Sequence, residues 1–336
     1  MKTILLDDVE SAAQVLRAGG LVAFPTETVF GLGADARNAV AIQRIFAAKG
    51  RPGDNPLIVH VADTRHWQLV ARELTKVGQR VLELFAPGPV TVVLPKSESI
   101  CALVTAGLDS VGLRIPAAEL TRDLLRIAGI PIAAPSANRS GRPSGTTWQS
   151  VLEDLDGRID AILCIDVPHV GLESSVIDCL GDEPVLLRPG AVGLADLQLH
   201  FPNARQAVPP SRLGDVQPPT RTLSPGLNHP HYQPRARVVL LEPDNGDDIR
   251  NWHPGENDKA KRIAYAGLKE GPRGMVLTEK FASVSDYAHG FYEFLRKADR
   301  AQVDVVLLEA ISIAAAGSSG VAAALRDRQR RSAGMN

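Results

Sequence analysis

Eight prolines fall between residues 201 and 237, and they constrain the fold of this chain more than any other feature. Proline lacks a backbone N–H and fixes φ, so a segment this rich in proline cannot continue a helix or a central strand. Such segments are typical of extended, semi-rigid linkers. Because 336 residues are enough for two hydrophobic cores, the sequence predicts a first domain at residues 1–201, a linker at 202–236 and a second domain at 237–336.

Strand-like and helix-like runs alternate before the linker and again after it. Short apolar runs predict strands, and longer runs with one apolar face predict helices. Before the linker we expect helices at 39–48 and 69–85, and strands at 20–24, 57–61, 90–95, 111–115, 132–134, 161–165, 175–178 and 185–188. After it we expect helices at 281–299 and 320–331, and strands at 237–241, 274–277 and 303–309. Both domains are therefore predicted to be α/β.

Composition and charge exclude several classes of protein. Apolar residues make up 44% and charged residues 22% of the chain, which is typical of a globular protein rather than a disordered or fibrous one. The formal net charge of −1 offers no general attraction to nucleic acid or membranes. No apolar run reaches about 18 residues and the N-terminus reaches acidic residues at once, so we expect a cytoplasmic protein without membrane contact. The three cysteines are too widely spaced to indicate a disulfide framework or a zinc site.

Two cations share one turn at residues 49–52 (KGRP). Lys49 and Arg51 are bracketed by glycine and proline where the helix predicted at 39–48 ends. A lysine supplies a point charge and an arginine a two-pronged donor, so the pair suits a polyphosphate. Taken alone, such a pair is more often solvated surface charge, so the phosphate interpretation depends on the surrounding motifs.

Polar turns adjoin two further predicted strands. Residues 134–144 (APSANRSGRPS) follow an apolar strand and carry hydroxyls and an amide that can hold phosphate or ribose. Residues 171–178 (GLESSVID) lead into a strand that ends at Arg188, which Pro189 follows. Ligands in open α/β sheets bind at the carboxyl ends of strands, where the first of these turns is expected. The alternative is ordinary turns rich in serine, asparagine and glycine.

Arg114 and His60 stand in apolar strand surroundings. A charge inside an apolar strand requires a partner or a ligand, and the structural alternative is a salt bridge to Asp178 or Glu27. A lone histidine after an apolar run is more often a hydrogen-bonded core residue than a catalyst. The sequence has no dinucleotide fingerprint, no Gly-Lys-Ser/Thr phosphate loop and no zinc-ligand spacing, so we expect no metal held by the protein itself.

Five motifs together closely resemble the threonylcarbamoyl-AMP synthase family, also called YrdC-like. They are residues 25–33 (PTETVFGLG), 49–52 (KGRP), 55–60 (NPLIVH), 135–138 (PSAN) and 187–190 (LRPG). The likeness covers roughly the first 200 residues, while the linker with Tyr232 and the second domain resemble the long form of the family. It implies a YrdC-like twisted, mixed, open sheet with flanking helices, followed by a smaller C-terminal α/β domain of Rossmann-like type.

The resemblance also implies an activity. Members are nucleotidyltransferases that join L-threonine, bicarbonate and ATP, with Mg²⁺, into threonylcarbamoyl-adenylate and release pyrophosphate. A tRNA-modifying transferase complex would receive the adenylate. The competing interpretation is an RNA-binding module of the same fold without catalysis, against which the near-zero net charge and the aromatic content of 4% argue mildly. A weak contact with RNA remains compatible with either interpretation.

Site residues of the family carry over only where the motifs match. The resemblance implies that Lys49 and Arg51 are electrostatic catalysts. Arg114 would pair with the threonine carboxylate, which would also explain its charge in an apolar strand. The other threonine contacts would be Thr28, His60 and Ser174, and the ATP contacts would be Lys49, Arg51, Asn55, Ser136, Asn138, Ser144, Arg188 and, closing over the nucleotide, Tyr232, with Ser110 a weaker candidate.

Overall fold

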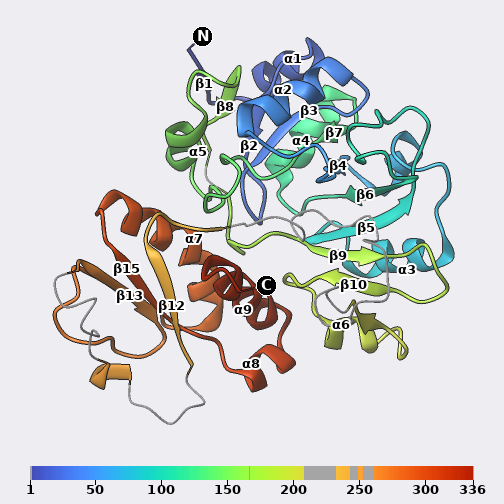
Figure 1. The fold of residues 1–336 in the computed structure, drawn as a ribbon. Helices are drawn as coiled ribbons and strands as arrows, with labels where there is room; N and C mark the ends of the chain where they lie inside the picture. The colour runs from blue at the N-terminus through green and yellow to red at the C-terminus, as the bar shows by residue number, and fades with distance from the viewer. Residues whose placement is uncertain (1, 166, 208–231, 243–248, 253–260, 336) are drawn as a thin grey trace.

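Two β-sheets organise the chain, one before and one after the proline-rich segment (Figure 1). A computed structural model describes residues 2–165, 167–207, 232–242, 249–252 and 261–335. The first sheet draws its strands from residues 4–206 and the second from residues 237–309. Residues 208–231, which make up most of the predicted linker, lie outside the described part.

The first sheet is mixed, as predicted, and its described strands follow the order β1-β8-β2-β3-β7-β4-β6-β5-β9-β10-β11. Antiparallel and parallel pairs alternate from β7 to β11, with β4 parallel to β6 and β5 antiparallel to β6. β11 comes from residues assigned above to the linker. The bounds are β1 (Ile4–Leu6), β2 (Val22–Phe24), β3 (Gly31–Asp35), β4 (Ile58–His60), β5 (Val90–Pro95), β6 (Ser110–Arg114), β7 (Ile132–Ala133), β8 (Ala161–Leu163), β9 (Ser175–Asp178), β10 (Val185–Arg188) and β11 (Arg205–Gln206).

The second sheet is smaller and parallel, in the order β12-β15-β13-β14. Its strands are β12 (Arg237–Leu241), β13 (Ile263–Gly267), β14 (Leu277–Lys280) and β15 (Val305–Glu309). Side chains of a strand alternate between its two faces, so Val306 and Leu308 pack on one side and Val305 and Leu307 on the other. The helices α7 (Val284–Arg300) and α9 (Gly320–Ser332) cover the first of these faces, and α8 (Ile313–Ser318) and the 3₁₀ turn η4 (Ile249–Asn251) complete the described elements of this domain.

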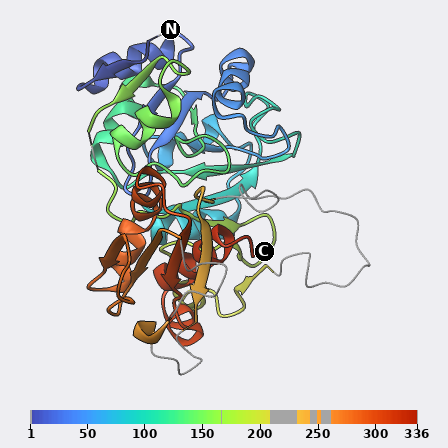
Figure 2. The same ribbon diagram turned by 60° about the vertical axis from the view of Figure 1, so that its left-hand side comes forward.

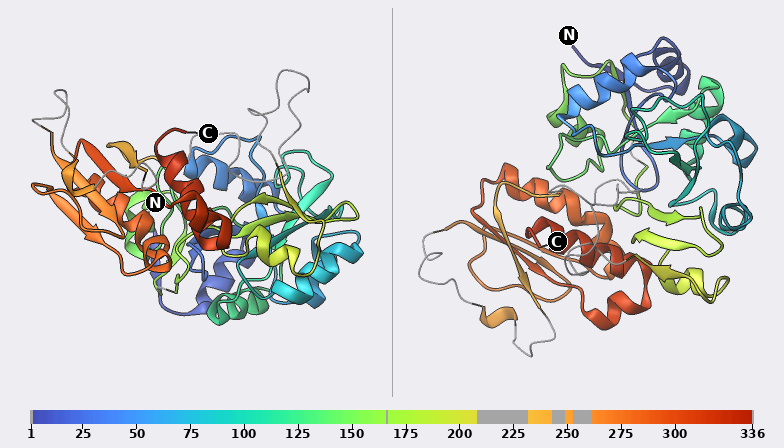
Figure 3. Two further views of the ribbon diagram at one scale, coloured as in Figure 1. Left: turned by 90° about the horizontal axis from the view of Figure 1, so that it is seen from below. Right: turned by 45° about the vertical axis from the view of Figure 1, so that its right-hand side comes forward.

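The second domain docks on the first through α7 and α9. The red helix α9 lies between the second sheet and the first domain in the views of Figures 2 and 3. Val29 and Leu172 of the first domain belong to the same buried apolar cluster as the α7 and α9 side chains. At Gly171, a Cβ atom would lie 2.4 Å from the His289 Cα atom of α7, so the backbones of the two domains touch there. The two domains therefore form a continuous packed unit over the described residues.

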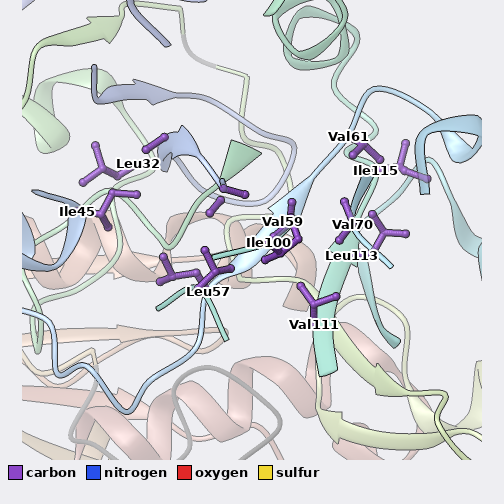
Figure 4. Close-up of a cluster of buried hydrophobic side chains, with 14 of the residues drawn as sticks. Leu32, Ile45, Leu57, Val59, Val61, Val70, Ile100, Val111, Leu113 and Ile115 are labelled. Atoms are coloured by element: carbon purple, nitrogen blue, oxygen red, sulfur yellow. The ribbon is translucent and has the colours of Figure 1, made fainter. Parts of the chain in front are cut away.

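Helices also enclose the first sheet on both faces. Leu16 of α1 and Leu124 of α4 pack against Phe24 on one face, and Ile45 of α2 packs on the other, where Figure 4 shows the larger apolar cluster. Burying one such large side chain contributes roughly 1.5–3 kcal/mol. The helices are α1 (Val9–Arg17), α2 (Ala39–Lys49), α3 (Lys76–Phe85), α4 (Glu119–Ala128), α5 (Trp148–Leu155) and α6 (Leu194–Gln198), with the 3₁₀ turn η1 (Thr64–Leu69).

Two predicted elements are wrong in position. The helix expected at 69–85 is divided, because η1 ends at Leu69 and the Thr75 side chain caps α3 by accepting a hydrogen bond from the Gly78 N–H at 3.0 Å. The strand expected at 274–277 begins at Leu277 instead, since Gly274 has φ of +81° and belongs to a turn.

Other elements were not predicted, among them β3, α1, α4, α5 and β13. The glycines of β3 suggest a turn, yet Gly33 lies where a Cβ atom would be 2.6 Å from the Phe24 ring. Glycine therefore serves close packing within the sheet at this position.

Candidate functional site

One pocket opens where the ends of several strands meet beside the second domain. It encloses about 660 Å³, part of it open to solvent. Its lining comes from the loop before β3, the turn after α2, the ends of β4, β6 and β10, the loop after β7, the residues just before β9 and Tyr232. The predicted site residues that it brings together are Thr28, Arg51, His60, Arg114, Ser136, Asn138, Ser174, Arg188 and Tyr232.

Lys49 and Arg51 point to different places although they share a turn. Gly50 adopts φ of +61° and ends α2, which lets the chain reverse direction between the two cations. Lys49 is buried, and its Nζ donates to the carbonyl oxygens of Ser136 and Asn138, both at 2.5 Å. Burial, with the nearby Arg51 charge second, holds the pKa of Lys49 well below its ordinary value. Lys49 thus fixes the backbone of the 136–138 loop and is not among the pocket-lining residues.

Arg51 is the cation of this turn that lines the pocket. Its Nε donates to the Asn55 carbonyl at 3.2 Å and its Nη2 to the Pro56 carbonyl at 2.9 Å. Burial lowers the pKa of Arg51 to about 10, so the side chain remains a cation at neutral pH. Asn55 contributes to the site through this carbonyl, from just outside the lining.

The loop after β7 presents a hydroxyl and an amide to the pocket. The Ser136 Oγ donates to the Asn138 Oδ1 at 2.6 Å, while the Asn138 Nδ2 donates to the Arg139 and Arg142 carbonyls at 2.9 Å each. These bonds fix the orientation of the amide, and Lys49 holds the carbonyls of the same loop. The loop is therefore a rigid polar platform.

Arg114 and Glu27 form a buried ion pair, as the structural alternative proposed. The Arg114 Nη2 lies 2.7 Å from the Glu27 Oε1, and the two side chains are 5% and 1% exposed. Burial raises the pKa of Glu27, but the Arg114 charge and hydrogen bond outweigh it and the net shift is downward. Neither the Arg114 Nε nor the Glu27 Oε2 has a hydrogen-bond partner among the described residues. Arg114 also lines the pocket, so the ion pair does not exclude a ligand.

His60 and the threonine hydroxyls lie close to this pair. His60 is directly opposite Arg114 in the register of β4 and β6. Burial, with the Arg114 charge second, lowers the pKa of His60 to about 3, so its imidazole is neutral at pH 7. The Thr26 hydroxyl donates to the Val29 carbonyl at 2.7 Å, so at the same distance it accepts from the Thr28 hydroxyl.

Hydrogen bonds connect Arg188, at the end of β10, with Ser174, just before β9. The Arg188 Nε and Nη2 donate to the Ser174 carbonyl at 3.1 and 3.0 Å. The Ser174 and Thr91 hydroxyls are 2.8 Å apart. Burial lowers the pKa of Arg188 from its ordinary value. A buried cation and two hydroxyls are thus held in one rigid group.

Ser144, Ser110 and Tyr232 occupy three different positions. Ser144 lies behind the lining, where its Oγ donates to the Glu173 Oε1 at 2.7 Å. Ser110 lines a smaller neighbouring space that shares Pro56, Leu57 and Ile58 with the main pocket. Tyr232 lines the main pocket with φ of +67°, a left-handed conformation that is uncommon for a residue with a large side chain.

The sequence did not predict two carboxylates, those of Glu27 and Glu173, as site residues. Glu27 was considered only as a partner for Arg114, and Glu173 was included in the polar turn at 171–178 but given no role of its own. Both line or adjoin the pocket and are buried. The available signal was an acidic residue between buried neighbours, since carboxylates are almost never fully buried without a partner. Two of the partners of Glu173, Tyr292 and Arg328, come from the second domain and leave no local signal.

Within the described ranges, no group of three or more His, Cys, Asp or Glu residues could hold a metal ion. No helix in that part of the chain is long and apolar enough to cross a membrane.

Comparisons with known proteins confirm the resemblance inferred from the motifs. Residues 14–190 match the family described as Telomere recombination, and residues 197–334 match Threonylcarbamoyl-AMP synthase, C-terminal domain. The threonylcarbamoyl-AMP synthase of Pyrococcus abyssi is 37% identical over 332 residues, which cover 97% of this chain and 94% of that protein. The threonylcarbamoyl-AMP synthase of Bacillus subtilis is 35% identical over 348 residues, with coverage of 97% and 93%.

A solved structure agrees with these sequence comparisons. The crystal structure of P. abyssi Sua5 complexed with L-threonine matches with a TM-score of 0.87 and 35% identity, covering 99% of this chain and 98% of that one. The match extends over both domains, which confirms the predicted fold class of a mixed α/β domain followed by a smaller α/β domain. The chain therefore belongs to the threonylcarbamoyl-AMP synthase family.

Proposed function

We propose that this chain catalyses the formation of threonylcarbamoyl-adenylate from L-threonine, bicarbonate and ATP, with release of pyrophosphate. The observation that carries the proposal is the convergence of three guanidinium groups on one pocket that also contains hydroxyls. They belong to Arg51, Arg114 and Arg188, and the last two of these residues are buried. The substrates of this reaction carry a carboxylate, a bicarbonate and a triphosphate, all of which arginine recognises. A similar protein, P. abyssi Sua5, has been crystallised with L-threonine.

Threonine would bind at the ends of β4 and β6. Arg114 uses its Nη2 for Glu27, and its remaining donors include the Nε that has no partner in the described part of the chain. A guanidinium of this kind can pair with the amino-acid carboxylate. We assign Thr28, Ser174 and the neutral His60 to the amine and hydroxyl of the substrate, because they supply acceptors and donors in the same pocket.

ATP would bind along Arg51, Arg188 and the 136–138 loop. The two cations would offset the charge that develops on the leaving pyrophosphate, as preorganised donors do in phosphoryl transfer. Ser136 and Asn138 would hold ribose or phosphate oxygens, and Tyr232 would close the pocket over the nucleotide.

The remaining predicted contacts would act from outside the lining. Lys49 would orient the 136–138 loop and would meet a phosphate by exchanging one of its two carbonyl partners. Asn55 would act through its carbonyl on Arg51, and Ser144 through Glu173. Ser110 would meet the nucleotide only if part of it enters the neighbouring space.

The protein would act mainly by positioning. The threonine amine attacks bicarbonate and water leaves, which gives a carbamate. A carbamate oxygen then attacks the α-phosphorus and the bond to pyrophosphate breaks. These steps need aligned reactants rather than a covalent enzyme intermediate, and a closed pocket would slow hydrolysis of the mixed anhydride. Mg²⁺ would come with the ATP phosphates, since the described residues offer no cage for it and Mg²⁺ commonly keeps waters and substrate phosphates as ligands.

The adenylate is a reactive intermediate, so an acceptor must follow. We propose that it passes to a tRNA-modifying transferase complex, which places the enzyme in the cytoplasm with its substrates. Direct contact with RNA would be weak, because the chain has a net charge of −1.

The test is pyrophosphate release from purified protein with ATP, Mg²⁺ and bicarbonate, with and without L-threonine, while rapid chromatography follows the adenylate. We expect pyrophosphate and a short-lived adenylate only when threonine is present. Salt-dependent RNA binding without threonine-dependent turnover would contradict the proposal and favour an RNA-binding module.

A further inference from the structure

A buried carboxylate links the pocket to the second domain. Glu173 lines the pocket and is 7% exposed, and both of its oxygens accept hydrogen bonds. Its Oε1 accepts from the Ser144 hydroxyl at 2.7 Å, and its Oε2 accepts from the Tyr292 hydroxyl of α7 at 2.9 Å and from the Arg328 Nε of α9 at 3.1 Å. The second domain therefore supplies two of the three side chains that hold this carboxylate in the described structure.

A negative charge in this position opposes the binding of a polyphosphate unless another group neutralises it. Burial raises the pKa of Glu173, yet the charges of Arg328 and then Arg188 lower it to about 2, so Glu173 is ionised at neutral pH. Arg188 is a pocket cation, and the Glu173 charge is among the influences that raise its pKa against the effect of burial. Arg328 and Arg188 are the two cations that lower the Glu173 pKa. Without Arg328, the negative charge of Glu173 would be offset by Arg188 alone.

Arg328 also holds the backbone beside that pocket cation. Its Nη1 donates to the Pro189 carbonyl at 2.9 Å, one residue after Arg188. Arg188 in turn donates to the Ser174 carbonyl, one residue after Glu173. Arg328 thus forms hydrogen bonds with both segments, 173–174 and 188–189, from which Ser174 and Arg188 line the pocket.

The same guanidinium faces the linker tyrosine. The Arg328 Cζ lies 5.8 Å from the centre of the Tyr232 ring, within the range of a cation–π contact. The ring of Tyr292 lies 5.2 Å from that of Tyr232. Tyr232 therefore lines the pocket while it rests on side chains of the second domain.

We propose that Arg328, which lies outside the motifs of the first domain, is a positioning residue that makes the second domain a working part of the nucleotide site. It neutralises Glu173, so that the Glu173 charge does not offset the charge that Arg188 presents to a polyphosphate, and it fixes the turn after β10 and the ring of Tyr232. The side chain is fully buried and is not among the pocket-lining residues, so it acts through these three neighbours. This inference rests on the proposed binding of ATP in the pocket.

The experiment compares Arg328→Met with a matched variant on the same helix, Arg326→Met. Arg326 pairs with Glu242 at 3.1 Å within the second domain, so its loss removes an ion pair without touching Glu173. Calorimetry with a non-hydrolysable ATP analogue measures affinity, and threonine-dependent pyrophosphate release measures turnover. We expect Arg328→Met to weaken the analogue by about tenfold to a hundredfold, and Arg326→Met to stay within about twofold of wild type.

A second substitution distinguishes positioning from general loss of folding. In Arg328→Met/Glu173→Gln the unpaired charge is gone, so analogue affinity should recover to within about fivefold of wild type. Equal affinities for wild type and Arg328→Met, or no recovery in the double variant, would overturn the proposal. If Arg328→Met does not fold, Arg328→Lys replaces it, and its charge should retain more analogue affinity than Arg328→Gln. Wild-type turnover, measured in parallel, tests the proposed function separately, because analogue binding does not require turnover.

Discussion

The buried pair of Arg114 and Glu27 allows stability and substrate binding to be separated. In Arg114→Met, the Glu27 carboxylate is left 1% exposed without its cation. Breaking a buried ion pair in this way costs about 3–5 kcal/mol. With about 2–4 °C per kcal/mol for a domain of this size, Tm should fall by roughly 6–20 °C. In Arg114→Met/Glu27→Gln the unpaired charge is absent, so we expect most of that stability to return.

Threonine binding should not return with it. If Arg114 pairs with the threonine carboxylate, its loss removes a charge-assisted hydrogen bond worth about 1.5–3 kcal/mol, or roughly 10- to 150-fold in Kd. Differential scanning calorimetry gives the stabilities, and isothermal titration with L-threonine gives the affinities. Glu27→Gln alone serves as the control that keeps Arg114. A double variant that binds threonine as tightly as wild type would refute the binding role and leave Arg114 as a structural residue only.

Three further predictions follow from the same contacts. Lys49→Met and Arg51→Ala should each lower adenylate formation by more than about tenfold, the first by freeing the 136–138 loop and the second by removing a pocket cation, and near-wild-type turnover in either would contradict its role. The pKa of His60 is about 3 in the folded chain against an ordinary value of 6.5, so the unfolded state binds more protons between these values and stability falls as pH falls through that window. Urea titrations between about pH 7 and pH 4 should therefore show a flatter pH dependence for His60→Gln than for wild type. Gly171→Ala should destabilise by clearly more than about 1 kcal/mol because a Cβ atom there meets the backbone of α7, whereas Gly274→Ala, with a similar φ and open space, should cost only about 1 kcal/mol in thermal unfolding.

Local sequence patterns predicted most of the strands, because the preference for a strand comes from residues that are adjacent along the chain. β5 and β9 were predicted with the bounds that the structure shows, since short runs of branched apolar residues favour buried strands. β3 was missed because its glycines suggest a turn, and only contact with Phe24 explains them. The helix expected at 69–85 was wrong because the local pattern was followed too far. Its apolar periodicity continues across Thr75, the residue that caps α3.

By itself, the sequence determined the cations, hydroxyls and amide of the site, because they stand beside glycine and proline at strand ends, but it did not determine the two carboxylates. Tertiary structure alone decided how those groups are used. Lys49 and Arg51 are two residues apart, yet the left-handed Gly50 turns one to a backbone loop and the other to the pocket. Glu173 and Arg328 are 155 residues apart, and no local pattern pairs them. A buried charge takes whichever partner the packing brings to it, so that partner follows from the fold of the whole chain rather than from its neighbours in sequence.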